Sequence, residues 1–413
     1  MNTRTVSFAI KYALAAAAAL PFCFSSAQAT VKFIPHVAVN YEDNSNLFAA
    51  DQVPRNDPDG QPRFGDTYRY YSGGLDLTGT FGEEKLGITS EIRRYRYDHF
   101  IQLNRDDKLF GLALDWVATG KIFGQLTGRY DEHQTPYTEI IDVFNNPNQQ
   151  SGNSNLVQID FRDVERDVGL ATNYRMTSKL LATLNLGYSR KSGPLNTSQR
   201  YDLQQAPASF SLRYGVLTKL TLGASAATNK GKYIQGGDAP TITSTQYTGL
   251  IDYTFSPRTS FGGSWGIGKY KQFGLESKSN IGNASFNQQL TDKTKYFIRY
   301  DRTYDFYTVT QGFQVNSTTT AGLTWQATRR LAFSGDYAVT DAEVQAGFAA
   351  GVFGVFGDTR KDKIKTSQVR MNYDVLKWLS ISPYYTFQER SSDAPGYNYR
   401  SRIIGATLTA KYQ

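Results

Sequence analysis

The sequence predicts an all-β protein, a transmembrane antiparallel up-and-down β-barrel of about 18 strands that is closed by the C-terminal strand. Three observations support this prediction. Apolar and polar residues alternate over long segments, short turns of one recurring chemistry separate these segments, and the 413 residues include 28 Tyr and 36 Gly. The mean hydropathy is −0.46, and no long apolar run follows residue 30, which excludes a helical membrane protein. A secreted β-sandwich or β-propeller is the soluble alternative.

The first residues have the pattern of a secretory signal. The apolar run Ala13–Leu20 follows positive charges, and Ala27–Ala29 is a small-x-small cleavage site. We therefore expect a signal peptide over residues 1–29 and a single barrel domain over 30–413. The only cysteine, Cys23, lies in the signal, so the mature chain would carry no disulfide and no thiol chemistry.

The strands are predicted from period-two alternation, which places successive side chains on opposite faces. About eight short turns, such as Leu290–Lys293, join pairs of alternating segments; most have an apolar residue, a small polar residue and then Lys or Arg. An even strand number with both ends on the periplasmic side is typical of bacterial barrels. The expected strands are near 31–43, 66–80, 86–99, 109–117, 122–133, 159–175, 180–192, 206–216, 220–235, 242–255, 259–273, 279–290, 294–308, 314–327, 331–342, 361–375, 378–391 and 398–413.

Each segment has one apolar and one polar face. An arginine on the lipid face at the bilayer midplane costs roughly 2–4 kcal/mol, so the polar face should line the lumen. The charged residues that we expect to line the lumen and to take part in transport are Arg93, Arg129, Arg175, Arg213, Arg299, Arg370, Asp76, Asp115 and Asp301. The alternative is that they only neutralise one another as arginine–carboxylate pairs.

The last segment alternates almost to the end of the chain. One face carries Ile404, Ala406, Leu408, Ala410 and Tyr412. We expect this segment to close the barrel against the strand near residues 32–40, which leaves no free sheet edge. Its glycine and apolar spacing resembles the signal read by the barrel-assembly machinery, and the residues predicted to form that signal are Gly405, Leu408, Ala410 and Tyr412.

Three connections are longer than the turns. Residues 44–65 and 134–157 are polar, whereas 343–360 is rich in glycine and apolar residues. Such connections fit the extracellular side of a barrel. Segment 343–360 could fold inward as a constriction or plug, or it could form a lid or a strand extension.

Enzyme chemistry is not expected. Gly262–Gly266 matches the G-x-S-x-G hydrolase pattern, but that motif requires a strand, a sharp turn and a helix, whereas here it lies inside an alternating segment. The histidines, His36, His99 and His133, have no metal-ligand spacing. We therefore predict no catalytic residue, no cofactor site and no metal site. The net charge of +8 suits acidic lipopolysaccharide or an acidic sugar polymer, and we expect no nucleic-acid partner.

The N-terminal third is similar to a family of barrel porins. Val39–Phe48 resembles the Y-x-D-N-x-F opening of the EpsL-like outer-membrane proteins, and Asp66–Asp76, Arg94–Asp98 and Leu114–Tyr130 continue the likeness. The resemblance implies a bacterial outer-membrane channel for exopolysaccharide secretion or biosynthesis. We hypothesise that translocation of this polysaccharide is passive, with periplasmic or inner-membrane export proteins as partners. The lumen is expected to be lined by Arg and by the tyrosines Tyr68, Tyr70, Tyr95, Tyr97, Tyr270 and Tyr384.

Other functions remain open on the sequence. A general or sugar-specific diffusion porin is the main alternative, because the same polar lumen would serve small solutes. A barrel hydrolase and a plugged structural barrel are further alternatives.

Overall fold

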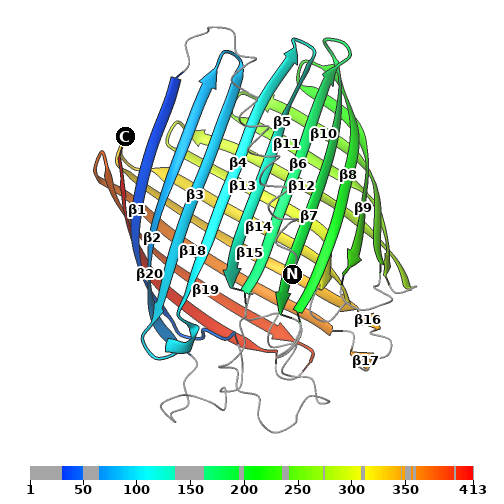
Figure 1. The fold of residues 1–413 in the computed structure, drawn as a ribbon. Coiled ribbons are helices and arrows are strands. Elements are labelled where there is room, and N and C mark those ends of the chain that lie inside the picture. Colours follow the sequence, from blue (N-terminus) through cyan, green and yellow to red (C-terminus); the bar gives the residue numbers. More distant parts are fainter. Residues whose placement is uncertain are drawn as a thin grey trace, which may run out of the picture.

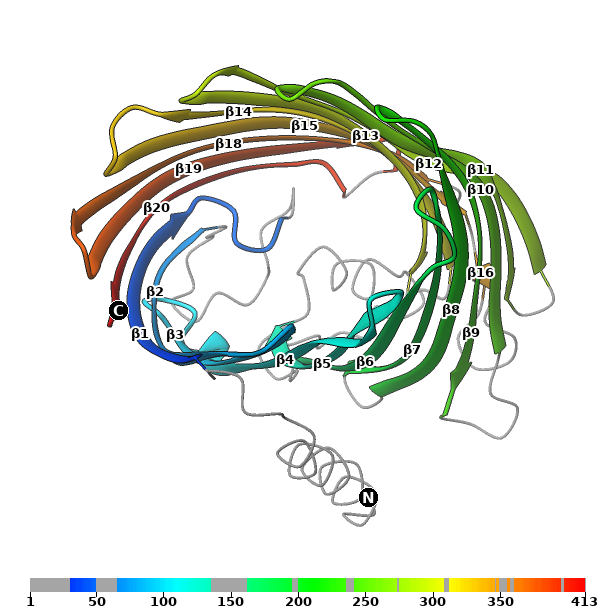
Figure 2. The same ribbon diagram turned by 90° about the horizontal axis from the view of Figure 1, so that it is seen from above.

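The computed structural model describes a closed barrel in which every long strand belongs to one sheet (Figures 1 and 2). The described residues are 30–49, 65–134, 162–194, 200–234, 241–272, 275–307, 312–345, 347–348, 355–356, 360–394 and 397–412. Among them, no helix has the length and apolar character needed to cross a membrane. The predicted signal peptide lies outside the described residues, as do most of the three long connections.

The sheet contains 18 strands, all antiparallel to their neighbours. They are β1 (Thr30–Asn44), β2 (Asp66–Phe81), β3 (Glu84–Tyr97), β4 (Arg105–Thr119), β5 (Ile122–Gln134), β6 (Arg162–Arg175), β7 (Leu180–Pro194), β8 (Arg200–Leu217), β9 (Leu220–Tyr233), β10 (Thr241–Ser256), β11 (Thr259–Gln272), β12 (Leu275–Thr291), β13 (Thr294–Tyr307), β14 (Gly312–Gln326), β15 (Leu331–Gln345), β18 (Arg360–Leu376), β19 (Leu379–Ser392) and β20 (Tyr399–Lys411). A short 3₁₀ turn, η2 (Ile101–Leu103), precedes β4, and β16 (Gly347–Phe348) pairs with β17 (Val355–Phe356).

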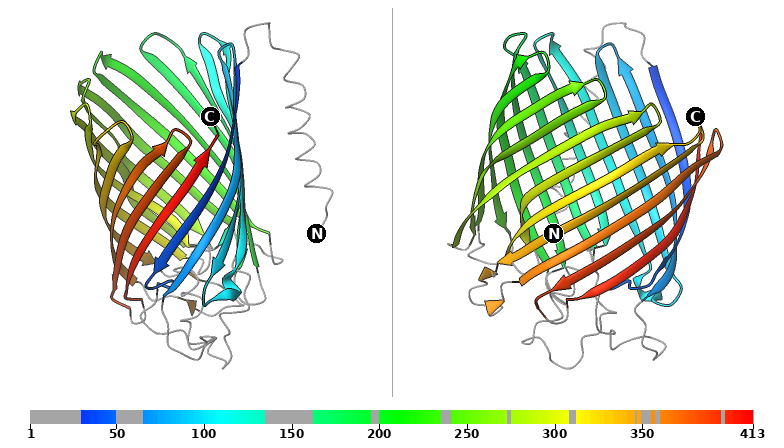
Figure 3. Two further views of the ribbon diagram at one scale, coloured as in Figure 1. Left: turned by 90° about the vertical axis from the view of Figure 1, so that its left-hand side faces the viewer. Right: turned by 180° about the vertical axis from the view of Figure 1, so that it is seen from behind.

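Each strand pairs with the next in the chain, and β20 pairs with β1, so the sheet has no open edge. The closing register runs from His36 opposite Lys411 to Asn44 opposite Ile403. The strands lie oblique to the barrel axis in side view (Figure 3), as closure of a twisted sheet requires. The predicted fold class, strand number and closing pair are confirmed.

The short turns all lie at one end of the barrel, which we call the turn end; the strand ends that the long connections join lie at the other, the loop end (Figure 1). A Ser or Thr side chain stabilises several turns by accepting backbone hydrogen bonds. Thr291 Oγ1 accepts from Lys293 N at 3.2 Å, and Thr328 Oγ1 accepts from Leu331 N at 3.1 Å. This bond explains the small polar residue that recurs in the turn sequences. The β2–β3 turn instead uses Gly82, whose φ is 66°.

The outer face of the barrel is an apolar band. Exposed side chains of this band include Val37, Ile92, Phe110, Leu186, Phe210, Tyr247, Trp265, Ile298, Leu323, Val369 and Leu408. Aromatic residues next to the turn end, such as Trp325 and Trp378, are also exposed, as expected of a ring at headgroup level. An apolar surface of this extent around a closed sheet is stable in lipid and not in water.

Three strands begin several residues earlier than the alternation predicts. β4 begins at Arg105, β8 at Arg200 and β12 at Leu275, against expected starts at 109, 206 and 279. All three starts lie at the loop end, where the outward positions carry charged residues in place of apolar ones. Arg94 and Asp106, for example, form a bidentate pair across β3 and β4 at 3.0 Å. At the loop end, both the outward and the inward side chains are polar, so the alternation is lost, but the backbone hydrogen bonds between strands continue.

Gly82→Ala should destabilise the barrel by about 1 kcal/mol, because a Cβ at positive φ contacts the following carbonyl. Urea unfolding of the refolded barrel in lipid measures this change. Gly120→Ala, in the β4–β5 turn, is the matched control, since a Cβ there meets no heavy atom within 4 Å. Equal effects of the two substitutions would contradict the conformational explanation.

Candidate functional site

The nine charged residues predicted for the lumen all lie on the face opposite the apolar band. The register aligns Ser72 with Arg93, Lys85 with Asp115 and Leu181 with Arg213, each of them opposite in parity to the exposed apolar positions. The same register carries Arg129, Arg175, Arg299, Arg370, Asp76 and Asp301 inward. Their role in transport stays a proposal.

Most of these charges are neutralised by a neighbour on the same wall. Arg93 Nη2 lies 2.6 Å from Glu91 Oε2, Arg299 Nη2 lies 2.9 Å from Asp301 Oδ1, and Arg129 bonds to Asp131. Such pairs join positions two apart on one strand, which share a face. Because they are partly exposed to the lumen, each contributes no more than about 1 kcal/mol of stability. Their larger effect is that the wall presents little net positive charge.

The remaining predicted residues have other partners. Arg213 Nη1 pairs with Asp252 Oδ2 at 3.1 Å across strands, and Asp115 accepts a hydrogen bond from Gln125 at 2.7 Å. Asp76 lies 3.6 Å from His36. The last two arginines lie over aromatic rings, Arg175 at 5.5 Å from the Phe123 centroid and Arg370 at 5.3 Å from that of Tyr384. No described carboxylate is paired with either of these two guanidinium groups.

A tyrosine–carboxylate cluster lines the lumen where the barrel closes. Glu42 on β1 accepts hydrogen bonds from Tyr68 on β2 and from Tyr384 on β19. Asn40 Nδ2 donates to the Tyr384 hydroxyl at 3.3 Å, and Thr407 on β20 donates to Asn40 Oδ1 at 3.2 Å. The cluster therefore connects β19, β20, β1 and β2 through side chains as well as through the backbone ladder.

The cluster continues along the wall as a row of rings. Tyr68 and Tyr97 have centroids 4.9 Å apart, and Tyr70 and Tyr95 are 5.1 Å apart. The Arg105 guanidinium lies 4.0 Å from the Tyr95 centroid and donates to the Tyr97 hydroxyl at 2.7 Å. Ring faces with polar edges beside them can contact the C–H faces and the hydroxyl groups of a sugar.

Gly405 makes room for this arrangement. An added Cβ at that position would lie 2.4 Å from Cζ of Tyr384, closer than any Cβ contact in a relaxed structure. The ring of Tyr384 therefore lies directly over the backbone of β20, from where its hydroxyl reaches Glu42. This is a structural reason for glycine at a position predicted to belong to the assembly signal. Leu408 and Tyr412 face outward and are exposed; recognition by the assembly machinery stays a prediction.

A second feature of the lumen wall lies on β7 to β13, and we call it the amide pocket. It has a volume of about 660 Å³. Gln246 Nε2 donates to the Tyr270 hydroxyl at 2.8 Å, and Asn185 Nδ2 donates to Ser209 Oγ at 3.0 Å. The side chains that line it are mostly uncharged: Asn185, Gln205, Ser209, Asn229, Ser244, Gln246, Tyr270 and Tyr304, with Lys191 as the cation.

Two details shape the amide pocket. Tyr270 stacks on Tyr304 with ring centroids 3.5 Å apart and an interplanar angle of 8°. Gly268 permits this position of Tyr270, because an added Cβ would lie 2.5 Å from its ring. The buried Oδ1 of Asn229 has no hydrogen-bond partner among the described residues, which leaves an acceptor in the pocket wall for a ligand hydroxyl or a water.

Sequence reasoning missed most of this pocket. Amide and hydroxyl side chains give a weaker signal in the sequence than charged side chains do. Strands β7 to β13 bring them together from distant positions in the chain. Glu42 was missed as well, since its importance depends on Tyr384, which lies 342 positions away in the sequence. The tyrosines Tyr68, Tyr70, Tyr95, Tyr97, Tyr270 and Tyr384, by contrast, were expected on the lumen face and are found there.

The motif Gly262–Gly266 lies wholly within strand β11, with Ser264 between Leu250 and Asn283 of the neighbouring strands. The sharp turn of a nucleophile elbow is absent at this position. His99 lies 2.9 Å from Asp66 and His133 lies 3.4 Å from Asp131. Within the described part of the chain, no group of three or more His, Cys, Asp or Glu residues is arranged to hold a metal ion.

The closed sheet, the apolar band and the polar inner wall define a transmembrane β-barrel of the bacterial outer-membrane type. Several solved structures are similar to it. They include Pseudomonas aeruginosa OpdQ, at 10% identity and TM-score 0.46 over 93% of this chain and 99% of that one, and P. aeruginosa OccK2 (OpdF) in complex with glucuronate, at 10% identity and TM-score 0.48 over 93% and 98%. The siderophore receptor PirA from P. aeruginosa matches at 10% identity and TM-score 0.47, over 94% and 81%.

The chain matches no protein-family model. No curated protein matches its sequence.

Gly405→Ala should destabilise the barrel by roughly 1–3 kcal/mol, because the added methyl group forces the Tyr384 ring away from Glu42. The measurement is the free energy of unfolding in urea, made in the wild-type and in the Tyr384→Ala background. The effect should vanish in the second background, where no ring remains to be displaced. Gly87→Ala is the control, since the nearest heavy atom to its Cβ is 3.9 Å away. A Gly405→Ala cost of the same size in both backgrounds would disprove the contact.

Proposed function

We propose that the protein is a passive outer-membrane channel through which small hydroxylated solutes, sugars above all, diffuse. The observation that supports this function is the inner wall of the barrel, which is polar along its length and whose charges are largely paired within the wall. Barrels of 16 to 18 strands are wide enough to hold an aqueous channel.

The chemistry of the wall favours a sugar over an ion. Amides and hydroxyls both donate and accept hydrogen bonds, as sugar hydroxyls do, and they supply most of the polar side chains that line the amide pocket. The stacked Tyr270 and Tyr304 and the row of rings beside Glu42 offer aromatic faces for the apolar side of a sugar ring. Weak contacts of this kind let a solute bind and leave, which a diffusion channel requires.

Exopolysaccharide secretion, with its export partners, is the finer function implied by the resemblance to EpsL-like proteins. Arg175 and Arg370 favour an acidic substrate, because their charges have no described carboxylate partner and face the lumen. The pairing of the other arginines reduces this attraction. The described wall offers the same contacts to a small sugar and to one unit of a polymer, so secretion stays a second candidate.

The channel function can be tested with single cysteines. Asn185→Cys places a thiol in the amide pocket, whereas Leu186→Cys places one in the apolar band, where Leu186 is exposed. Proteoliposomes with wild-type barrel should swell in small neutral sugars. A bulky hydrophilic thiol reagent should react with Asn185→Cys and slow the swelling several-fold, and it should leave Leu186→Cys unmodified because lipid covers that face. Swelling no faster than in protein-free liposomes would overturn the channel function.

A deletion strain separates the two candidate functions. If the protein serves diffusion of small sugars, loss of the gene should slow uptake of an external sugar and leave surface exopolysaccharide at its normal amount. Loss of surface polysaccharide with unchanged sugar uptake would replace the diffusion function by secretion. Complementation with the Asn185→Cys chain, with and without the thiol reagent, controls for indirect effects of the deletion.

A further inference from the structure

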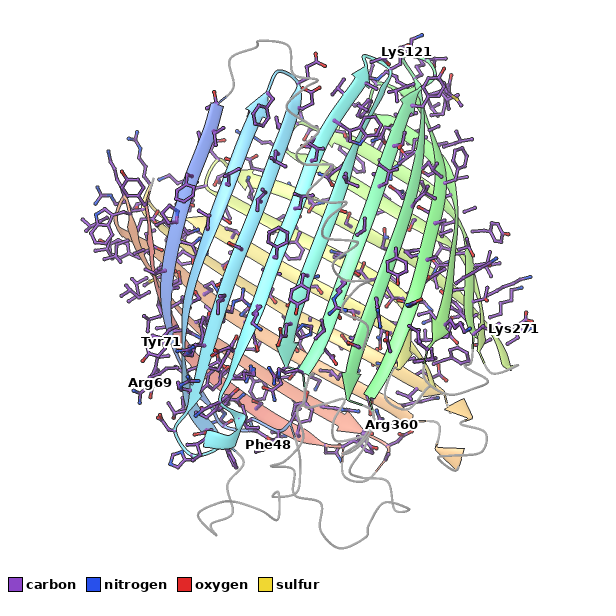
Figure 4. The ribbon with its side chains drawn as sticks, viewed as in Figure 1. Phe48, Arg69, Tyr71, Lys121, Lys271 and Arg360 are labelled. Atoms are coloured by element: carbon purple, nitrogen blue, oxygen red, sulfur yellow. The ribbon has the colours of Figure 1, made fainter. Side chains whose placement is uncertain are left out.

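A patch of lysines lies on the outer face of β9 to β12 at the loop end. It consists of Lys230, Lys232, Lys269, Lys271 and Lys278, which are all exposed. The register places Lys230 and Lys271 on either side of Thr243 in β10, so their backbones are about 10 Å apart. Lys269 stands directly opposite Lys278 in β12. Figure 4 shows Lys271 away from the turn end, marked by Lys121, with its side chain pointing out from the barrel.

These five lysines are only slightly compensated by negative charge. None of them forms an ion pair with a described residue, and Glu276, opposite Lys271, is the one carboxylate aligned with any of them in the register. The direct opposition of Lys269 and Lys278 is itself unfavourable, because like charges facing each other across a strand pair destabilise the sheet. A partner of opposite charge would remove this repulsion.

Along much of the rest of the outer edge at the loop end, cations are matched with carboxylates. Arg69 pairs with Asp98 at 3.2 Å, Lys108 with Glu132 at 3.1 Å and Arg400 with Glu389 at 2.8 Å. Arg94–Asp106, Arg162–Glu132, Lys365–Glu389 and Lys363–Asp341 are further pairs along this edge. Exposed cations without a described carboxylate partner also occur elsewhere on this edge, as at Arg96, Lys361 and Arg402, but these lie on separate strands, whereas β9 to β12 bring five lysines together.

The patch lies directly above the apolar band. Lys269 follows the exposed Ile267 by two positions on β11, and Tyr247, which aligns with Ile267, is 58% exposed on β10. Two positions along a strand correspond to about 7 Å. The ammonium groups therefore lie at the level of lipid headgroups, beside the acyl chains that cover the band. A soluble anion would make no use of the apolar residues beside the patch. A lipid with an anionic headgroup can contact the lysines through its headgroup and the apolar band through its acyl chains.

We infer that the lysine patch binds the phosphate groups of a phosphorylated glycolipid of the outer leaflet, the leaflet that faces the loop end. Several lysines whose backbones are roughly 5–10 Å apart can contact two phosphates of the same molecule, while the acyl chains lie along Ile267 and Tyr247. This inference uses the outer face and is independent of what passes through the lumen. It goes beyond the general expectation of lipopolysaccharide contact, because it assigns the contact to one side of the barrel.

The test compares two triple variants of the full barrel, purified in detergent. The patch variant is Lys230→Gln, Lys269→Gln and Lys271→Gln. The control variant, Lys121→Gln, Lys179→Gln and Lys377→Gln, removes the same charge from exposed turn-end lysines. Native mass spectrometry measures binding of bisphosphorylated lipid A, dephosphorylated lipid A and phosphatidylglycerol. Heat modifiability on a gel confirms that both variants are folded.

The patch variant should lose at least about tenfold in affinity for bisphosphorylated lipid A, because three of the five positive charges that attract the phosphates are removed. The control variant should keep its affinity. Wild-type binding should weaken by a similar factor when the phosphates are removed from the lipid. Equal losses in both variants, or equal binding of dephosphorylated lipid A, would overturn the inference. Equal affinity for phosphatidylglycerol would show a site for any anionic lipid and would overturn the assignment to a glycolipid.

Discussion

The hydrogen bonds between the first and last strands are the constraint on which the rest of the barrel depends. A membrane leaves no alternative partner for backbone N–H and C=O groups, so an 18-strand sheet is stable there only if β20 pairs with β1. Side chains strengthen this junction on the lumen face. Glu42 holds Tyr68 and Tyr384 from either side of it, and Gly405 leaves the space in which Tyr384 can reach across. The closing strands thus form part of the inner wall as well as the last element of the sheet.

Closure also determines how charge is distributed. Each strand presents one row of side chains to lipid and one row to the lumen, so cations in the membrane region are confined to the inner row. There they meet carboxylates from the same or the adjacent strand, as Arg299 meets Asp301 and Arg213 meets Asp252. The outward row can carry charge only at the barrel ends. At the loop end many cations of that row are paired, and the lysines of β9 to β12 form a group without ion pairs among the described residues.

The two candidate sugar-binding features differ in how they are held. The tyrosine–carboxylate cluster is joined by hydrogen bonds across the closure. It is continuous with Arg105 on β4, which pairs with Asp107 and lies over the Tyr95 ring. The amide pocket extends along the wall from β7 to β13, and some of its polar groups bond to one another, as Gln246 donates to Tyr270. In both, a glycine leaves room for a tyrosine ring: Gly405 for Tyr384 and Gly268 for Tyr270. A wall with two such features on different strands gives a passing solute more than one place to bind weakly.

The sequence by itself determined the strand number, the position of each turn, the face on which each charged residue lies and the strand that closes the barrel. It could do so because alternation has a period of two and lipid strongly penalises charge on the outer face. A shift of one residue in a strand would exchange its two faces and place its charged side chains in lipid. The pairing of Arg93 with Glu91 is also predictable from the sequence, since positions two apart on a strand share a face. Only the tertiary structure decided which residues meet across strands. Glu42 with Tyr384, the stacked Tyr270 and Tyr304, and the lysines of β9 to β12 depend on register and on chain segments distant in sequence. Period-two alternation restricts that register only to steps of two residues.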